Sequence, residues 1–138
     1  MSALYDSDFC EWVEQQKVFL KEKAFEHLDI EHLLEEMNDM GKADRRSIES
    51  HLEIALIHFL KQKYQPDYSS KSWQDSIYNA IVQIDNIIEN SPSLKNHPKI
   101  CLEKCYVRAR RYAAKQTKLD INIFPKECPW TLEEILGE

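Results

Sequence analysis

Apolar residues recur every three or four positions along most of the chain, which is the period of an α-helix with one buried face. The first such stretch predicts a helix over about residues 7–25, with an apolar stripe of Phe9, Trp12, Val13, Phe19 and Leu20. A second helix is expected to begin at Asp29, whose carboxylate can cap the free amides that follow it. We expect Gly41 to end this helix, because glycine readily takes the left-handed conformation of a helix C-terminus.

The third predicted helix, about residues 43–64, is apolar on almost every side. Ile54 and Ile57 lie opposite its main apolar face, so this helix is expected at the centre of the fold or in a contact between subunits. The main apolar face consists of Ile48, Leu52, Ala55, Leu56, Phe59 and Leu60.

Two further long helices and a short terminal one complete the pattern. Isoleucines at helical spacing follow Trp73, and a fifth helix is predicted over about residues 98–117. Thr131 and Glu134 have the spacing of a capping box, which opens a short C-terminal helix. The sequence therefore predicts an all-α fold: a single-domain helical bundle, residues 1–138, with four to five main helices and a short C-terminal helix.

The composition limits the range of possible functions. With only two glycines, Gly41 and Gly137, the chain cannot build a phosphate-binding loop, and no small-molecule substrate is evident. The net charge of −6 disfavours nucleic-acid binding. No secretory signal or membrane-spanning segment is expected. Four cysteines without a CxxC pair indicate reduced thiols, and we expect a cytoplasmic protein.

Three residues of the third helix are candidates for catalysis. Arg46 and His51 have the Arg-x4-His spacing of the helical ribonucleases known as HEPN domains, in which a histidine could act as acid or base and an arginine could bind phosphate. Five residues on a regular helix, however, separate the two side chains by about 140°. His58 lies one heptad after His51 and is expected to be a buried or half-buried structural histidine, hydrogen-bonded near Tyr64 or Trp73.

A metal site is a further alternative. His97, Cys101 and Cys105 recur every four residues and could align as zinc ligands, although cysteines also behave as small apolar residues in cores. The chain contains no Glu-x-x-His sequence, which argues against a di-iron centre of the ferritin type. We expect neither a metal nor another cofactor.

Charge is unevenly distributed. Positions 26–53 carry nine acidic against three basic residues, whereas the fifth predicted helix carries a basic stripe. The stripe could be a docking face for RNA, DNA or an acidic protein. We favour the other interpretation, in which it pairs with the acidic helices of the same molecule or is solvated. The stripe consists of Lys104, Arg108, Arg111, Lys115 and Lys118.

Seven short blocks occur in the order typical of one family. They are Tyr5–Trp12, Leu28–Glu36, Ile57–Lys61, Tyr64–Pro66, Ser72–Trp73, Ser91–Leu94 and Phe124–Thr131. Together they resemble the bacterial family catalogued as domain of unknown function 29 over nearly the whole chain. The resemblance implies a small all-helical cytoplasmic protein and brings no activity or catalytic residue. Where that family has a Thr-Gly-Leu turn, this chain has Thr117-Lys-Leu119.

These observations favour a non-enzymatic module that binds another protein and self-associates, with a homodimer as one form. The alternatives are a ribonuclease using Arg46 and His51, and a metal-binding helical protein.

Overall fold

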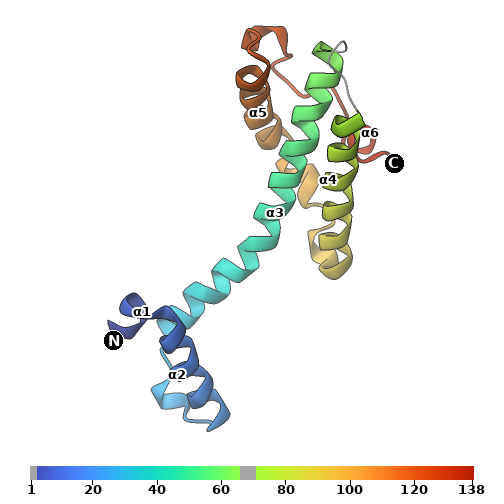
Figure 1. The fold of residues 1–138 in the computed structure, drawn as a ribbon. Helices are drawn as coiled ribbons and strands as arrows, with labels where there is room; N and C mark the ends of the chain where they lie inside the picture. The colour runs from blue at the N-terminus through green and yellow to red at the C-terminus, as the bar shows by residue number, and fades with distance from the viewer. Residues whose placement is uncertain (1–2, 66–70) are drawn as a thin grey trace. The chain divides into compact units, whose positions relative to one another are not determined.

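The computed structural model describes residues 3–65 and 71–138, and these residues form helices with a longer irregular segment between the last two (Figure 1). The four main helices are α2 (Phe9–Lys21), α3 (Ile30–Tyr64), α4 (Lys71–Asn90) and α5 (His97–Thr117). Two short helices, α1 (Ala3–Ser7) and α6 (Leu132–Leu136), lie near the ends of the chain. Single 3₁₀ turns occur at Phe25–His27, Pro92–Leu94 and Ile121–Ile123. The predicted all-α bundle is confirmed.

Contacts divide the chain into two compact units, which we call the N-terminal unit (Met1–Lys42) and the C-terminal unit (Ala43–Glu138). The helix α3 contributes its first part to the N-terminal unit and the rest to the C-terminal unit. The prediction of a single domain over residues 1–138 stays a prediction.

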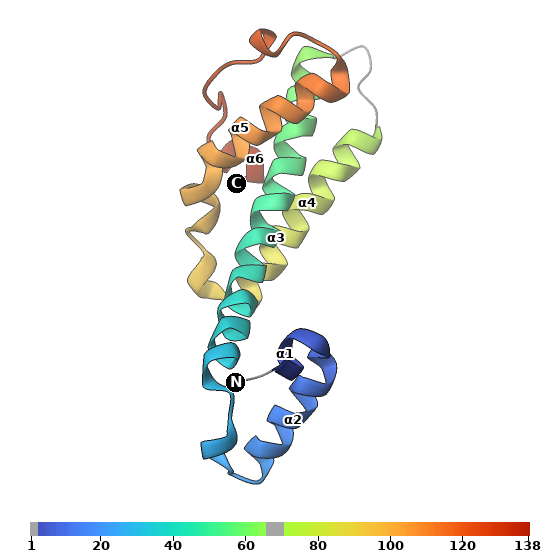
Figure 2. The same ribbon diagram turned by 90° about the vertical axis from the view of Figure 1, so that its left-hand side faces the viewer.

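The C-terminal unit has a continuous apolar core between α3, α4 and α5, which Figure 2 shows side by side. Five of the six residues on the predicted main face of α3 are buried in it, and Ile57, predicted on the far side, is buried as well. The Tyr106 hydroxyl of α5 donates a hydrogen bond to the Pro125 carbonyl at 2.6 Å, which ties the C-terminal segment to the helices. Thr131 caps α6 by accepting from the Glu134 amide at 3.2 Å, as predicted.

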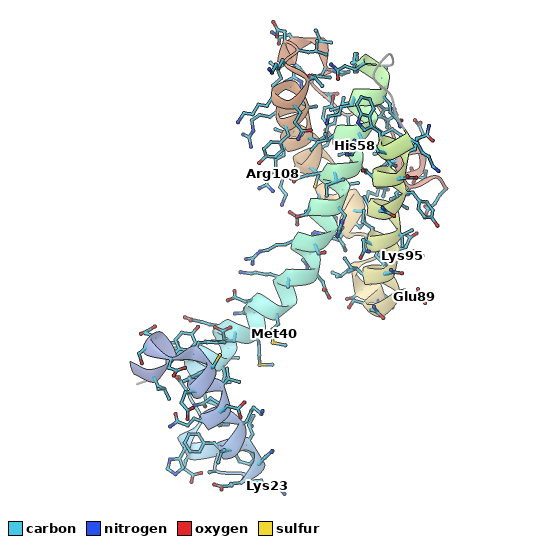
Figure 3. All side chains as sticks on the ribbon, in the orientation of Figure 1. Lys23, Met40, His58, Glu89, Lys95 and Arg108 are labelled. Atoms are coloured by element: carbon cyan, nitrogen blue, oxygen red, sulfur yellow. The ribbon has the colours of Figure 1, made fainter. Side chains whose placement is uncertain are left out.

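The predicted first helix, about residues 7–25, is wrong at both ends. Asp8 interrupts it, because its non-helical backbone and its side chain, which accepts from the Glu11 amide, make it the N-cap of α2. Lys23 then takes a left-handed conformation with φ of 57°, and the Ala24 amide bonds back to the Phe19 carbonyl at 2.8 Å. A lysine therefore ends this helix in the conformation expected of a glycine; Figure 3 shows its position.

The predicted helix end at Gly41 is also wrong, because α3 passes through this residue without a break. Gly41 has no positive φ, whereas Gly137 has φ of 75° and ends α6. Lys118 has φ of 61° after α5, so a lysine takes the left-handed position at the Thr117-Lys-Leu119 turn. The end of the third predicted helix at Tyr64 is confirmed, although Pro66 lies outside the described residues.

The two glycines are expected to respond in opposite ways to alanine. Gly41→Ala should raise the free energy of unfolding by about 0.5–1 kcal/mol, because alanine loses less entropy in a helix. Apart from its chain neighbours and the backbone of its own helix, no described atom lies within 4 Å of an added Cβ there. Gly137→Ala should lower it by about 1–2 kcal/mol, because its φ is left-handed. Urea unfolding followed by far-UV circular dichroism measures both, and a loss of stability in Gly41→Ala would contradict a continuous α3.

Candidate protein-binding groove

The side chain of Asp29 joins α2 to the start of α3. One carboxylate oxygen, Oδ2, accepts hydrogen bonds from the Trp12 indole at 3.0 Å and from the His32 ring at 2.8 Å. The Asp29 amide donates to the side-chain oxygen of Gln16 at 2.8 Å. The His32 amide points to the other oxygen, Oδ1, at 3.4 Å, so the predicted capping role of Asp29 is confirmed. These bonds hold α2 against the first turn of α3.

Charge and ring stacking reinforce this junction. The hydrogen bond to Asp29 raises the pKa of His32 despite partial desolvation. Desolvation raises the pKa of Asp29, but the bonds from His32 and Trp12 outweigh it and lower the pKa overall. The Tyr5 ring stacks on His32 with centroids 3.9 Å apart. Its hydroxyl donates to Glu36 at 2.5 Å, and this bond raises the pKa of Tyr5. We call this hydrogen-bonded and stacked group the frame of the N-terminal unit; it consists of Tyr5, Trp12, Gln16, Asp29, His32 and Glu36.

An apolar groove opens beside this frame, entirely within the N-terminal unit. We call it the methionine groove; it has a volume of about 410 Å³. Met37 and Met40 on α3 remain 64% and 73% exposed, and Met40 projects from the helix in Figure 3. The floor is Trp12, only 1% exposed. The remaining lining is Phe9, Val13, Gln16, Lys17, Leu20, Leu33 and Glu36.

The sequence did not predict this groove. Phe9 and Leu20 were expected on the stripe that α2 buries, but both are about half exposed. The available signal was the run of large apolar residues at the start of α3, too many for one buried face. Ile30 and Leu34 of this run are exposed in addition to the two methionines. Several large apolar side chains exposed to solvent next to one another are typical of an interaction surface.

The basic stripe of α5 is partly paired within the molecule. The Lys104 ammonium lies 2.6 Å from the Glu49 carboxylate, and the Arg108 guanidinium lies 3.4 Å from that of Glu53. Both acids are on α3, so Lys104 and Arg108 pair with acidic residues of the same molecule, which is the interpretation that we favoured. Arg111 lies over the Tyr112 ring, 5.6 Å from its centroid. The two remaining residues, Lys115 and Lys118, are exposed.

The candidate zinc ligands make other contacts. The His97 ring lies 2.9 Å from the Glu49 carboxylate, which Lys104 also contacts. The Cys101 thiol points to the Pro98 carbonyl and the Cys105 thiol to the Glu49 carbonyl, each at 3.6 Å. The neighbouring thiol of Cys101 and burial raise the pKa of Cys105, which keeps it protonated. In the part of the chain that the structure describes, no three His, Cys, Asp or Glu side chains gather as a metal site.

The ribonuclease candidates are on α3 in the C-terminal unit. His51 lines a groove of about 230 Å³ between α3 and α4, together with Ser76, Asn79 and Gln83. Arg46 is exposed and is not among the residues that line this groove. The structure therefore does not bring the two side chains to one cavity, and their catalytic role stays a prediction.

His58 lies beside Trp73, as predicted, with ring centroids 6.4 Å apart. Its Nδ1 is buried and has no hydrogen-bond partner among residues 3–65 and 71–138, so the predicted hydrogen bond is not found at this nitrogen. The ammonium of Lys61 lies 5.8 Å from the centroid of the same Trp73 ring. Burial lowers the pKa of His58, and the charge of Lys61 adds to this effect.

A pH dependence follows from this shift. Because the pKa of His58 is lower in the folded than in the unfolded chain, the unfolded state takes up the proton first. We expect stability to fall as the pH decreases below about 6.5, the ordinary pKa of histidine. Wild type and His58→Leu, unfolded by urea across this range, measure the effect. Their stability difference should change below about pH 6.5 and be constant above it, whereas a difference constant at every pH would contradict the shift.

The fold and the groove define a class: an all-helical protein with an exposed apolar groove next to a hydrogen-bonded frame. The chain belongs to the family described as Domain of unknown function DUF29, whose sequence model matches residues 4–138. Neither the curated proteins nor the solved structures contain a match to this chain. No described helix combines the length and apolar character that crossing a membrane requires.

Proposed function

We propose that this protein is an interaction module that binds a segment of another polypeptide in the methionine groove. The observation that carries the proposal is the exposure of Met37 and Met40 over a floor formed by buried Trp12. Burying apolar surface contributes about 25 cal/mol per Å², so a partner that covers this groove gains binding energy from it. Methionine side chains are flexible and polarisable, and they adapt to apolar partners of different shape.

The frame around Asp29 supports this proposal, because it fixes two residues of the groove lining and leaves the two methionines uncovered. Trp12 and Gln16 are tied to the junction by their hydrogen bonds, while Met37 and Met40 stay exposed. A preorganised site loses less entropy on binding than one that must first be ordered. A helix laid into a groove between two helices is a common mode of peptide recognition.

Self-association, which was predicted from the third helix, stays a separate prediction. The second apolar side of α3 was its basis, and Ile57 on that side is buried within the C-terminal unit. Ile54 on the same side is partly exposed, so the surface left for a subunit contact is smaller than the sequence indicated.

Site-specific photo-crosslinking in the native cells tests the proposal. Benzoyl-phenylalanine replaces Met40 in one protein and Ile100, an exposed residue of α5, in the control. We expect position 40 to give a defined crosslinked protein and position 100 to give none. Leu20→Asp, which places a charge in the groove, should abolish the crosslink, whereas Val18→Asp on the exposed side of α2 should not. Equal labelling from both positions, or insensitivity to Leu20→Asp, contradicts the proposal.

A further inference from the structure

The N-terminal unit buries very little of its own apolar surface. Among its described residues only Trp12 and Gln16 are buried. The unit is under a third of the chain, yet it contains eight of the fifteen large apolar side chains that are exposed in the described parts of the protein. The eight are Phe9, Val18, Leu20, Phe25, Ile30, Leu34, Met37 and Met40. The core of this unit is therefore little more than one tryptophan.

A unit with so small a core needs a further source of stability. Chains shorter than about 40 residues usually fold only with disulfides, metal ions or oligomerisation. A disulfide within residues 1–42 is not possible, because Cys10 is their only cysteine. Residues 3–42 contain no group of three His, Cys, Asp or Glu side chains placed to hold a metal ion. Association with another chain would bury the exposed apolar side chains of α2 and α3 and so stabilise the unit.

The exposed apolar surface consists of a groove with a ridge beside it. Ile30 and Leu34 are 55% and 56% exposed and do not line the methionine groove, whereas Met37 does. The three residues follow one another on α3 at intervals of four and three, the spacing of an apolar seam between packed helices. We call Ile30 and Leu34 the apolar ridge. A surface with both a ridge and a groove is self-complementary, because a two-fold axis can place the ridge of each copy opposite the groove of the other.

Charge in the groove does not select a charged partner. Lys17 and Glu36 are the only charged residues that line it. The ammonium of Lys17 lies 3.1 Å from the carboxylate of Glu14, and Glu36 accepts a hydrogen bond from Tyr5. The other acidic residues in the first part of α3 lie about 150° around the helix from the groove, at 100° per residue. They are Glu31, Glu35 and Asp39.

We propose that the occupant of the methionine groove is a second copy of this chain. Each copy lays its apolar ridge into the groove of the other, so that two α2–α3 hairpins pack as a bundle of four helices. This proposal rests on the proposed function and names the other polypeptide. The contact differs from the one predicted from Ile54 and Ile57, which belong to the C-terminal unit. Two-fold symmetry buries the ridge and the groove of both copies at once.

Sedimentation equilibrium of the full-length protein tests this proposal. We expect a dimer. Leu34→Asp in the ridge and Leu20→Asp in the groove should each weaken it at least tenfold, because a charge then faces an apolar surface. The matched control, Val18→Asp, adds the same charge on the exposed side of α2 outside the groove and should change the dimer little. Far-UV circular dichroism checks that each variant keeps its helices.

Two measurements on the wild-type protein do not depend on how the variants fold. Residues 1–42 contain eleven Asp and Glu against four Lys, so two N-terminal units repel each other. Added NaCl should therefore tighten the dimer, because it screens this repulsion. In a mixed dimer of one copy with ¹³C-labelled methionine methyl groups and one unlabelled copy, isotope-filtered NOEs should join Met37 or Met40 to Ile30 or Leu34 of the other copy.

Other results overturn the proposal in distinguishable ways. A monomer at the concentrations used for NMR overturns it, and a crosslink from position 40 to a different protein would then leave the proposed function standing. A dimer that Ile54→Asp dissociates and Leu34→Asp does not would place the contact in the C-terminal unit. A dimer that salt weakens, or that Val18→Asp weakens as much as Leu20→Asp, would be governed by charge. No crosslink at all from position 40 would remove the proposed function, and this proposal with it.

Discussion

Trp12→Ala is expected to unfold the N-terminal unit while the core of the C-terminal unit stays folded. Replacing a buried tryptophan with alanine costs about 3–5 kcal/mol. The whole stability of a unit of this size is about 2–6 kcal/mol, at about 0.05–0.15 kcal/mol per residue. The indole of Trp12 also donates to Asp29, so its removal leaves that carboxylate with one partner fewer at the junction of α2 and α3.

Hydrogen exchange followed by mass spectrometry measures this effect segment by segment. The amides of α2 should lose their protection in Trp12→Ala, and those of α5 should keep it. Val18→Ala, on the exposed side of the same helix, serves as the control and should leave both unchanged. Trp12→Phe retains the aromatic contact with Tyr5 but loses the hydrogen bond, so its effect should be intermediate. Unchanged protection of α2 in Trp12→Ala would show that the frame does not depend on this residue.

Leu52→Ala is expected to cost the C-terminal unit about 2–5 kcal/mol, because it removes three buried carbons and leaves a cavity in a close-packed core. Leu52 is 0% exposed and belongs to the core cluster between α3, α4 and α5. Ile100→Ala on α5 is the control: its side chain is 76% exposed, and such substitutions change stability by about 0.5 kcal/mol or less.

Urea unfolding compares the two variants, and hydrogen exchange of α5 shows where stability is lost. A loss in Leu52→Ala that is no larger than in Ile100→Ala would mean that this helix face is not the centre of the core. The comparison also tests the sequence pattern itself, since Leu52 was predicted on the main apolar face from spacing alone.

The candidate site was predictable only in parts. The capping role of Asp29 followed from its position before an apolar run, because a cap acts through amides only a few residues away. The bonds of Asp29 to Trp12 and Gln16 could not be predicted from the sequence, since they join residues 17 and 13 positions apart along the chain. The pairing of Glu49 with His97 and Lys104 spans still longer separations, and a helical period contains no information about it.

The sequence by itself determined the all-α class, the buried face of α3 in the C-terminal unit and the cap of α6. Each of these depends on spacing within one helix, where geometry follows from the backbone period. Tertiary structure decided which residues end the helices: Gly41 continues α3, while Lys23 and Lys118 take the left-handed conformation.

Tertiary structure also decided which apolar residues of the N-terminal unit are buried. Both α2 and the start of α3 carry large apolar residues, yet Trp12 is enclosed and Met37 and Met40 remain exposed. Apolar spacing shows that a side chain lies on an apolar face, but burial requires another element to cover that face. In the N-terminal unit α3 covers only part of this surface, and the methionine groove is the part that remains open.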